Sequence, residues 1–121
     1  MKLLTRDDII NATDLKTEEV PVPEWGGKVL VKTLNGTERD RFEASITSAK
    51  GKKVVMNTAN IRARLVAMTV VDENGKPLFK QADIEALGAK SASGLDRVFS
   101  VALRLAGMKE EDIDELTENF P

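Results

Sequence analysis

The stretch from Ser91 to Gly107 constrains the fold more than any other part of the chain. Its apolar residues recur at the three- and four-residue intervals of an α-helix, and further apolar residues lie off that face. A helix that is apolar on more than one side is buried on more than one side, so we expect it at the centre of the protein. Ser91 or Ser93 is its predicted N-cap, and Gly107 ends it. The predicted core face consists of Leu95, Val98, Phe99, Ala102, Leu105 and Ala106, with Val101 and Leu103 outside it.

Capping residues and apolar spacing predict helices elsewhere in the chain. The stretch from Lys50 to Lys53 interrupts the helical pattern and predicts an exposed basic loop. The further predicted helices run from Thr5 to about Ala12, from Asn35 or Thr37 to about Ala49, from about Thr58 to Thr69, from Gln81 to Leu87 with Gly88 as a left-handed C-cap, and from Lys109 to Glu118.

Two segments have the pattern of β-structure. Between Lys16 and Leu34, valines alternate with prolines, Gly26-Gly27 forms a turn, and a second apolar run follows, which predicts a β-hairpin. The prolines cannot donate to a strand ladder, so the first arm is an edge strand. Between Val70 and Phe79, an Asn-Gly pair predicts a smaller hairpin or turn. We therefore expect an α+β, mostly helical fold, with residues 1–121 forming one compact domain of five or six helices.

The residue types that most enzymes and metal sites need are missing. The chain has no histidine and no cysteine, which excludes the usual nucleophile–base pairs and thiolate zinc sites. Ser91 beside Lys90 is more simply a helix cap than a catalytic pair. The segment Asp72–Gly75 resembles part of a calcium loop, but Val70 stands where the first ligand is needed. We expect no catalysis, no cofactor and no metal.

The 121 residues carry a net charge of −2, but the charge is unevenly distributed. The stretch from Glu38 to Arg64 has seven cations and three acids, whereas Lys109–Pro121 has one cation and six acids. A nucleic-acid site in the basic stretch is disfavoured because acids interleave with the cations and aromatic residues are scarce. The first residues do not form a secretion signal, and no apolar run is long enough to cross a bilayer.

Three groups of residues, in this order and spacing, resemble a known family. Over about Leu3 to Glu118, the chain is similar to the tail assembly chaperones of long-tailed bacteriophages. The residues that carry the resemblance are Val22–Val31 with Leu34 and Glu38–Glu43, then Arg64–Phe79, and then Ile84–Ser91 with Leu95–Phe99 and Leu103–Gly107.

The resemblance implies a non-enzymatic assembly factor of the host cytoplasm that is absent from the mature virion. Such chaperones coat the tape measure protein, keep it soluble, and help to recruit major tail protein subunits. Many exist in two forms, and this chain would match the shorter form or the part that both forms share. A structural virion component, such as a small tail or head–tail adaptor protein, is the alternative. Neither reading involves nucleic acid or a membrane.

Candidate protein-binding residues follow from the charge pattern and from the single tryptophan. The basic stretch of one copy is expected to contact the acidic Lys109–Pro121 of another, or the two segments fold together within one chain. Tryptophan is enriched in binding hot spots, which predicts Trp25 at the partner surface, and a cap on the domain core is the alternative. The candidate residues are Trp25, Arg39, Arg41, Lys52, Lys53, Arg62, Arg64, Glu110, Glu111, Asp114 and Glu115.

Overall fold

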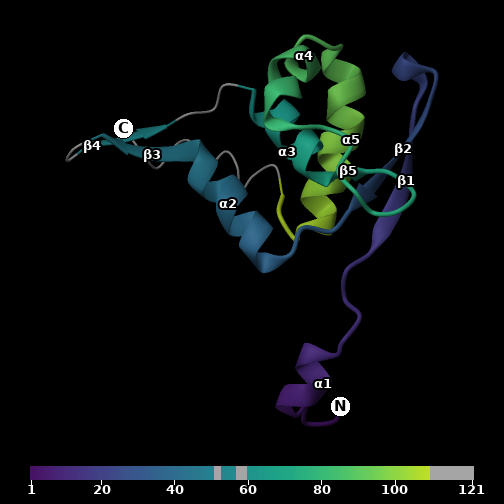
Figure 1. Cartoon of the computed structure of the whole chain (residues 1–121), viewed down its shortest axis with the longest axis vertical. Helices are drawn as coiled ribbons and strands as arrows, with labels where there is room; N and C mark the ends of the chain where they lie inside the picture. Colours follow the sequence, from purple (N-terminus) through teal and green to yellow (C-terminus); the bar gives the residue numbers. More distant parts are fainter. Residues whose placement is uncertain (51–52, 57–59, 110–121) are drawn as a thin grey trace.

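Helix α5 (Ala92–Leu105) is central to the fold and packs against a second helix and two strands. This is seen in the computed structural model of the chain, which describes residues 1–50, 53–56 and 60–109 (Figure 1). Ser91 caps α5 as expected, because its Oγ accepts a hydrogen bond from the Gly94 N–H at 3.0 Å. Gly107 ends the helix with a φ of 72°. Within α5 the buried residues are Gly94, Leu95, Val98, Phe99, Ala102 and Leu103.

The buried face of α5 therefore differs slightly from the predicted one. Leu103 is 2% exposed, although its spacing placed it off the core face. Leu105 and Ala106 are only partly buried at the end of the helix. The helix is enclosed on several sides, so a residue beside the main apolar stripe is also covered.

The predicted N-terminal hairpin is confirmed and belongs to a three-stranded antiparallel sheet. Strands β1 (Thr17–Val22) and β2 (Gly27–Lys32) pair in the register Val20↔Val29, and a 3₁₀ turn at Pro23–Trp25 joins them. The strand order is β1-β2-β5, where β5 is Val70–Val71. Strand β1, which contains proline, thus lies at an edge, as proline's missing N–H predicts.

Two helices and a short connecting segment cover the core beside α5. Helix α2 (Gly36–Ile46) begins at Asn35, whose Oδ1 accepts from the Glu38 N–H at 2.8 Å, while Glu38 accepts from the Asn35 N–H at 3.1 Å. This reciprocal capping box fixes the start of the helix. Helix α3 (Ile61–Thr69) contacts α2, α4 and α5. A 3₁₀ turn at Gln81–Asp83 leads into the short helix α4 (Ile84–Gly88).

A second hairpin occupies the region where a helix end and a basic loop were expected. Helix α2 ends at Ile46 rather than near Ala49, and β3 (Thr47–Lys50) pairs with β4 (Lys53–Met56). The segment contains Thr47 and two adjacent valines, which are β-branched residues that favour strands over helices. The predicted first turn of α3, around Thr58, lies outside the described residues.

Two turn predictions need correction. The return strand after Asn74-Gly75 is reduced to one bridge, between Val71 and Pro77, because proline cannot extend a ladder by its own N–H. Gly88 is the last residue of α4 and is not in the left-handed region. It is glycine for a different reason, since a Cβ at this position would collide with the side chain of Asn60.

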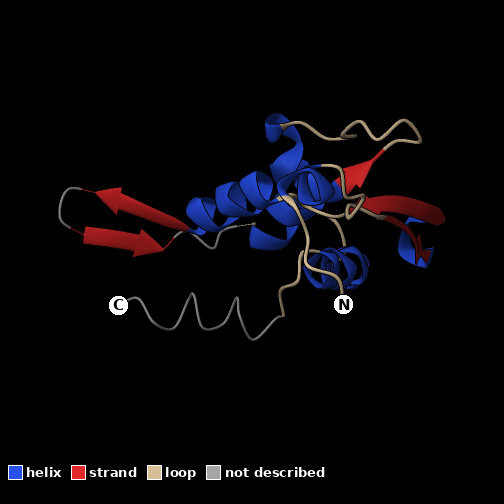
Figure 2. Ribbon diagram, turned by 90° about the horizontal axis from the view of Figure 1, so that it is seen from below, coloured by secondary structure: helices blue, strands red, loops and turns tan. Residues whose placement is uncertain are grey.

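The core lies between α5, α3, α2 and the sheet, and two parts of the chain project from it. The short helix α1 (Arg6–Ile10) lies beyond the end of β1, and the β3–β4 hairpin extends from the end of α2 (Figures 1 and 2). The predicted acidic helix from Lys109 to Glu118 lies almost entirely outside the described residues. The fully buried side chains of the core include Val22, Val31, Phe42, Ile46, Leu65, Val66, Val70, Val98 and Leu103.

Candidate functional site

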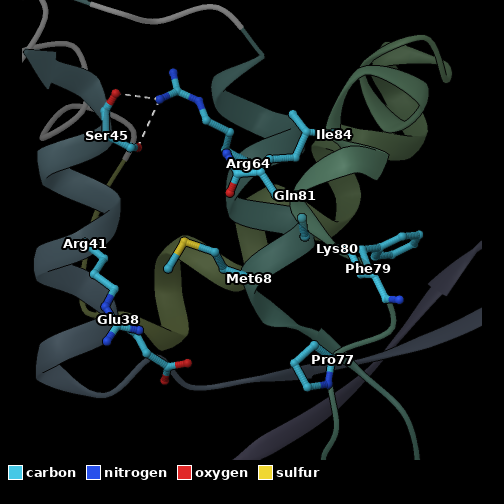
Figure 3. Close-up of a pocket in the computed structure, with 11 residues that line it drawn as sticks. Glu38, Arg41, Ser45, Arg64, Met68, Pro77, Phe79, Lys80, Gln81 and Ile84 are labelled. Atoms are coloured by element: carbon cyan, nitrogen blue, oxygen red, sulfur yellow. Dashed lines mark hydrogen bonds between the residues drawn. The ribbon is translucent and has the colours of Figure 1, made fainter.

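A groove of about 350 Å³ lies between α2, α3 and the segment of residues 77–84. Its floor is mainly apolar and its rim is charged. Figure 3 shows the Met68 side chain extending from α3 toward α2, and Arg64 reaching across to Ser45. The lining residues are Glu38, Arg41, Ser45, Arg64, Ala67, Met68, Pro77, Phe79, Lys80, Gln81 and Ile84.

The rim of this groove has an excess of positive charge, with three cations and one carboxylate. Arg64 is held in place because its Nη1 donates to the Ser45 carbonyl at 2.7 Å and to the Ser45 Oγ at 3.0 Å. Burial lowers the pKa of the Arg64 guanidinium, but arginine stays charged at neutral pH. Arg41 attracts the neighbouring Glu38 carboxylate electrostatically, whereas Lys80 forms no ion pair with any described residue.

The carboxylate on the rim, Glu38, is already paired. It accepts a hydrogen bond from Lys32, and both side chains are about three-quarters buried, with 24% and 22% exposed. Burial acts to raise the pKa of Glu38, but the hydrogen bonds from Lys32 and from the Asn35 N–H outweigh burial, so the pKa is lowered overall. Glu38 therefore stays ionised and caps α2, leaving the groove with a net positive rim.

A second hollow of about 300 Å³ shares Phe79 with the groove and is also lined by Ala86 and Leu87 of α4. Leu78 stands at its mouth with 52% of its surface exposed, while Leu87 is buried. Asp83 and Lys90 supply one charge of each sign. Seven large apolar residues of the described chain are exposed, and all of them except Leu78 lie in the first 15 residues.

The remaining exposed apolar residues lie in an arm, which we define as residues 1–16. None of the residues of α1 is buried, although a capping box between Thr5 and Asp8 fixes its start. Lys16 ties the end of the arm to the sheet, since its carbonyl accepts from the Thr33 N–H at 2.8 Å and its N–H donates to the Thr33 Oγ1 at 3.1 Å. The exposed large apolar residues of the arm are Met1, Leu3, Leu4, Ile9, Ile10 and Leu15.

The cations singled out from the sequence lie on different surfaces rather than in one stripe. Arg39 donates to Glu43 at 3.0 Å and to the Ala106 carbonyl at 3.2 Å, which ties α2 to the end of α5. Arg62 pairs with Asp96 and lies 5.6 Å from the centre of the Phe99 ring. Among the cations whose side chains the structure describes, Arg41 and Arg64 come together at the groove. Lys80 joins them there, and sequence reasoning missed it because no local pattern links it to α2.

Other candidate residues are less informative in the structure. Lys52 and the acids Glu110, Glu111, Asp114 and Glu115 lie outside the described residues. Lys53 begins β4, opposite Lys50. The predicted contact between the basic stretch and the acidic segment, whether between copies or within one chain, therefore stays a prediction.

Trp25 lies against the start of α5. It is partly buried and packs on the core, and an ideal Cβ on Gly94 would come within 3.1 Å of its Nε1. The buried Nε1–H has no hydrogen-bond partner among the described residues. The residue therefore joins the turn of the N-terminal hairpin to the central helix.

The described residues contain no cluster of three or more His, Cys, Asp or Glu side chains suited to a metal ion. In the same part of the chain, no helix has the length and apolarity needed to span a bilayer.

Comparison with known proteins identifies the family of the chain. No curated protein and no solved structure is significantly similar to the chain. The family model for phage tail assembly chaperones, however, matches residues 8–118. This range includes α2, α3, α5, the sheet, the groove and the hollow. The chain belongs to the phage tail assembly chaperone family.

Proposed function

We propose that the protein is a non-enzymatic chaperone that binds the tape measure protein, keeps it soluble and helps to recruit tail tube subunits. It would act in the host cytoplasm and leave before the virion is complete. Membership of the tail assembly chaperone family supports this assembly role.

Leu78 and the hollow beside α4 are the observation that carries the binding proposal. A chaperone that keeps an apolar helical client in solution needs exposed apolar surface, and Leu78 provides it on the body. The hollow next to it is lined by the apolar residues Phe79, Ala86 and Leu87. An amphipathic helix docks by placing apolar side chains into such a depression.

The two charges at the hollow suit the polar flank of a client helix. Asp83 and Lys90 lie at its border, where a polar rim excludes water from the apolar contact and orients the partner. Because they have opposite sign, they do not favour a strongly charged client. An apolar segment of a tape measure helix therefore fits this hollow better than the cationic groove.

Co-expression with a candidate tape measure protein tests the proposal. We expect the parent chain to raise the soluble fraction of the tape measure protein, and Leu78→Asp to lose at least half of that gain. Asn74→Asp is the matched control, since it makes the same change in net charge on an exposed residue of the same loop. Circular dichroism of each variant confirms that the fold is retained.

Three outcomes would contradict parts of this proposal. If the tape measure protein precipitates equally with and without the parent chain, the chaperone function is wrong. If Leu78→Asp solubilises it as well as the parent does, the hollow is not the client site. If mass spectrometry finds the chain in purified virions at tail stoichiometry, the structural virion component replaces the chaperone.

A further inference from the structure

The chain has two Asn-Gly pairs, Asn35-Gly36 and Asn74-Gly75, and all four residues are exposed. Asparagine before glycine is prone to deamidation, because a following residue without a Cβ leaves its backbone nitrogen open to the asparagine side chain. The reaction closes a five-membered ring between that nitrogen and the side-chain Cγ. It therefore needs a side chain that is free to turn and a backbone that is free to follow, and the two pairs differ in both respects.

At Asn35 both freedoms are restricted by the start of α2. The Asn35 Oδ1 accepts a hydrogen bond from the Glu38 N–H at 2.8 Å, and the Glu38 carboxylate accepts from the Asn35 N–H at 3.1 Å. Turning the amide towards Gly36 would remove this cap from the helix. Gly36 is itself the first residue of α2, which the fully buried Phe42 and Ile46 anchor in the core. Ring closure at Asn35 thus requires the first turn of α2 to come apart.

At Asn74 the side chain is free to turn, because its amide makes no hydrogen bond within the described part of the chain. The hydrogen bonds that hold the turn around it all involve Asp72. The Asp72 Oδ1 accepts from the N–H groups of Asn74 at 2.8 Å and Lys76 at 3.0 Å. The Asp72 carbonyl accepts from the Gly75 N–H at 2.9 Å, and the Asp72 N–H donates to the Lys76 carbonyl at 2.8 Å.

This turn can open without uncovering the core. Residues 73–78 are all exposed, so opening breaks the hydrogen bonds to Asp72 but loses no buried apolar contact. Gly75, with a φ of 81°, follows the change readily, since glycine populates both signs of φ. Small exposed units open more often than elements packed on a core. The Gly75 nitrogen is therefore released from Asp72 far more often than the first turn of α2 is lost.

From these observations we infer that Asn74 is a site of spontaneous deamidation and that Asn35 is protected, although both precede glycine. In the open turn, the Gly75 nitrogen gives up its proton to water and attacks the Asn74 Cγ. A new N–Cγ bond forms, the Cγ–Nδ2 bond breaks, and the amide nitrogen takes up a proton and leaves as ammonia. Water then opens the resulting succinimide at Cγ to give aspartate, or at the main-chain carbonyl to give isoaspartate. Nothing is oxidised or reduced in either step.

Both products change the turn. Each adds a carboxylate close to Asp72 and Glu73, where like charges repel. Isoaspartate also routes the chain through its Cβ, which adds one backbone carbon between Asp72 and Lys76 and shifts the hydrogen bonds across the turn out of register. The inference concerns the chemistry of this chain and does not depend on the client site at Leu78.

Incubation of the full chain in mildly alkaline buffer, followed by peptide mapping with mass spectrometry, measures the rate at each asparagine. In the folded chain we expect Asn74 to deamidate at least tenfold faster than Asn35. In concentrated urea the cap and the turn are both lost, so the two rates are expected to lie within about threefold of each other. An isoaspartate-specific methyltransferase then distinguishes the two products in the Asn74 peptide.

One variant tests the restraint at the turn. Asp72→Ala removes the side-chain acceptor that holds the turn closed, and it is expected to raise the rate at Asn74 severalfold without changing the rate at Asn35. Glu73→Ala is the matched control, since it removes a neighbouring carboxylate that forms no hydrogen bond with any described residue. It is expected to leave both rates close to those of the parent.

A second variant tests the restraint at the cap. Glu38→Ala removes half of the capping box, and it is expected to raise the rate at Asn35 severalfold without changing the rate at Asn74. Asp40→Ala is the matched control, because it removes an exposed carboxylate of the same helix that takes no part in the cap. Circular dichroism checks that each variant remains folded during the incubation.

Three results would overturn the inference. If Asn35 deamidates as fast as Asn74 in the folded chain, the cap gives no protection. If both asparagines react in urea but neither reacts in the folded chain, the Asp72 turn protects Asn74 and the site does not exist. If Asp72→Ala leaves the rate at Asn74 unchanged, opening of the turn does not control the reaction.

Discussion

At Trp25 a single side chain joins two parts of the fold that are far apart in sequence. Its ring lies against Gly94 at the first turn of α5, and the neighbouring Glu24 accepts hydrogen bonds from Arg97 at 2.8 Å and Ser93 at 2.9 Å. The turn between β1 and β2 is thereby held to the central helix. The position of Trp25 agrees with a role at the edge of the core, which was one of the two predicted roles.

Substitutions at Trp25 are expected to separate packing from hydrogen bonding. Trp25→Ala removes a partly buried ring and should lower the free energy of unfolding by about 2 kcal/mol or more. Trp25→Phe keeps most of the ring and removes an N–H without a partner, so the change should stay within about 1 kcal/mol. Urea denaturation measures both. Equal loss in the two variants would contradict this account, and a loss of client binding by Trp25→Phe at unchanged stability would place Trp25 in the interface.

Glu38 couples the stability of α2 to pH. Its folded pKa lies below the ordinary value of 4.5, because hydrogen bonds from Lys32 and the Asn35 N–H prevail over burial. A carboxyl group with a lowered folded pKa contributes stability that is fully present above its unfolded pKa. That contribution is lost as the pH falls through the lower, folded value.

Glu38→Gln is expected to remove the pH-dependent part of this stabilisation. Glutamine can still complete the capping box, so the variant isolates the loss of charge. We expect the parent to be more stable by about 0.5 to 1 kcal/mol at pH 7. The difference should shrink as the pH falls below 4.5. Denaturation curves of parent and variant across this range check the sign, and a difference that grew in acid would contradict it.

Predictions for single residues were confirmed where the structure depends only on neighbours in the sequence. Ser91 and Gly107 act as predicted because capping depends on residues within one turn. Gly88 was misread because its constraint comes from Asn60, which is distant in sequence. No local pattern reports such a contact.

At the scale of elements, α5 shows which interactions hold the fold. The helix also forms exposed ion pairs with neighbouring elements, such as Arg104 with Glu18 of β1. Their side chains are 60% and 39% exposed, and exposed pairs contribute little because water screens them and ordering long side chains is unfavourable. Leu103, the adjacent residue, is 2% exposed.

Neighbouring substitutions in α5 are therefore expected to differ strongly. Leu103→Ala should lower the free energy of unfolding by about 3 kcal/mol, since it leaves a cavity in the core. Arg104→Ala should lower it by less than about 0.5 kcal/mol. Thermal or urea unfolding of the two variants measures this difference. Comparable losses would mean that the ion pair with Glu18 is a major stabilising contact.

Most elements could be predicted from the chain, but their assembly into a site could not. The N-terminal hairpin, α2, α3 and α5 follow from periodicity and caps, whereas the β3–β4 hairpin was missed because helix and strand signals overlap near Thr47. The groove combines residues from Glu38 to Ile84 that meet only after α2 packs on α3. Arg41 and Arg64 were singled out for charge, but their grouping with Lys80 depends on tertiary structure.

At the scale of the whole molecule, contacts between copies should depend on salt. The Debye length falls from about 10 Å at 0.1 M salt to about 3 Å at 1 M, which weakens attraction between the acidic segment Lys109–Pro121 of one copy and the basic stretch from Glu38 to Arg64 of another. We expect association through this predicted contact to weaken severalfold over that range. Sedimentation at the two salt concentrations measures this. Association that does not change with salt would exclude a charged contact.

Deleting the acidic segment Lys109–Pro121 provides a second test of this predicted contact. Sedimentation of the shortened chain is expected to show weaker association than the parent at low salt, and unchanged association would contradict the contact.

Both edges of the three-stranded sheet carry a proline: Pro21 lies in β1, and Pro77 bridges to β5. Neither has an N–H to offer to an added strand. The sheet is therefore poorly suited to edge-to-edge growth, which is a common route to aggregation. The proposed chaperone role would benefit from this, since the protein could bind an apolar client through side chains without templating β-aggregates.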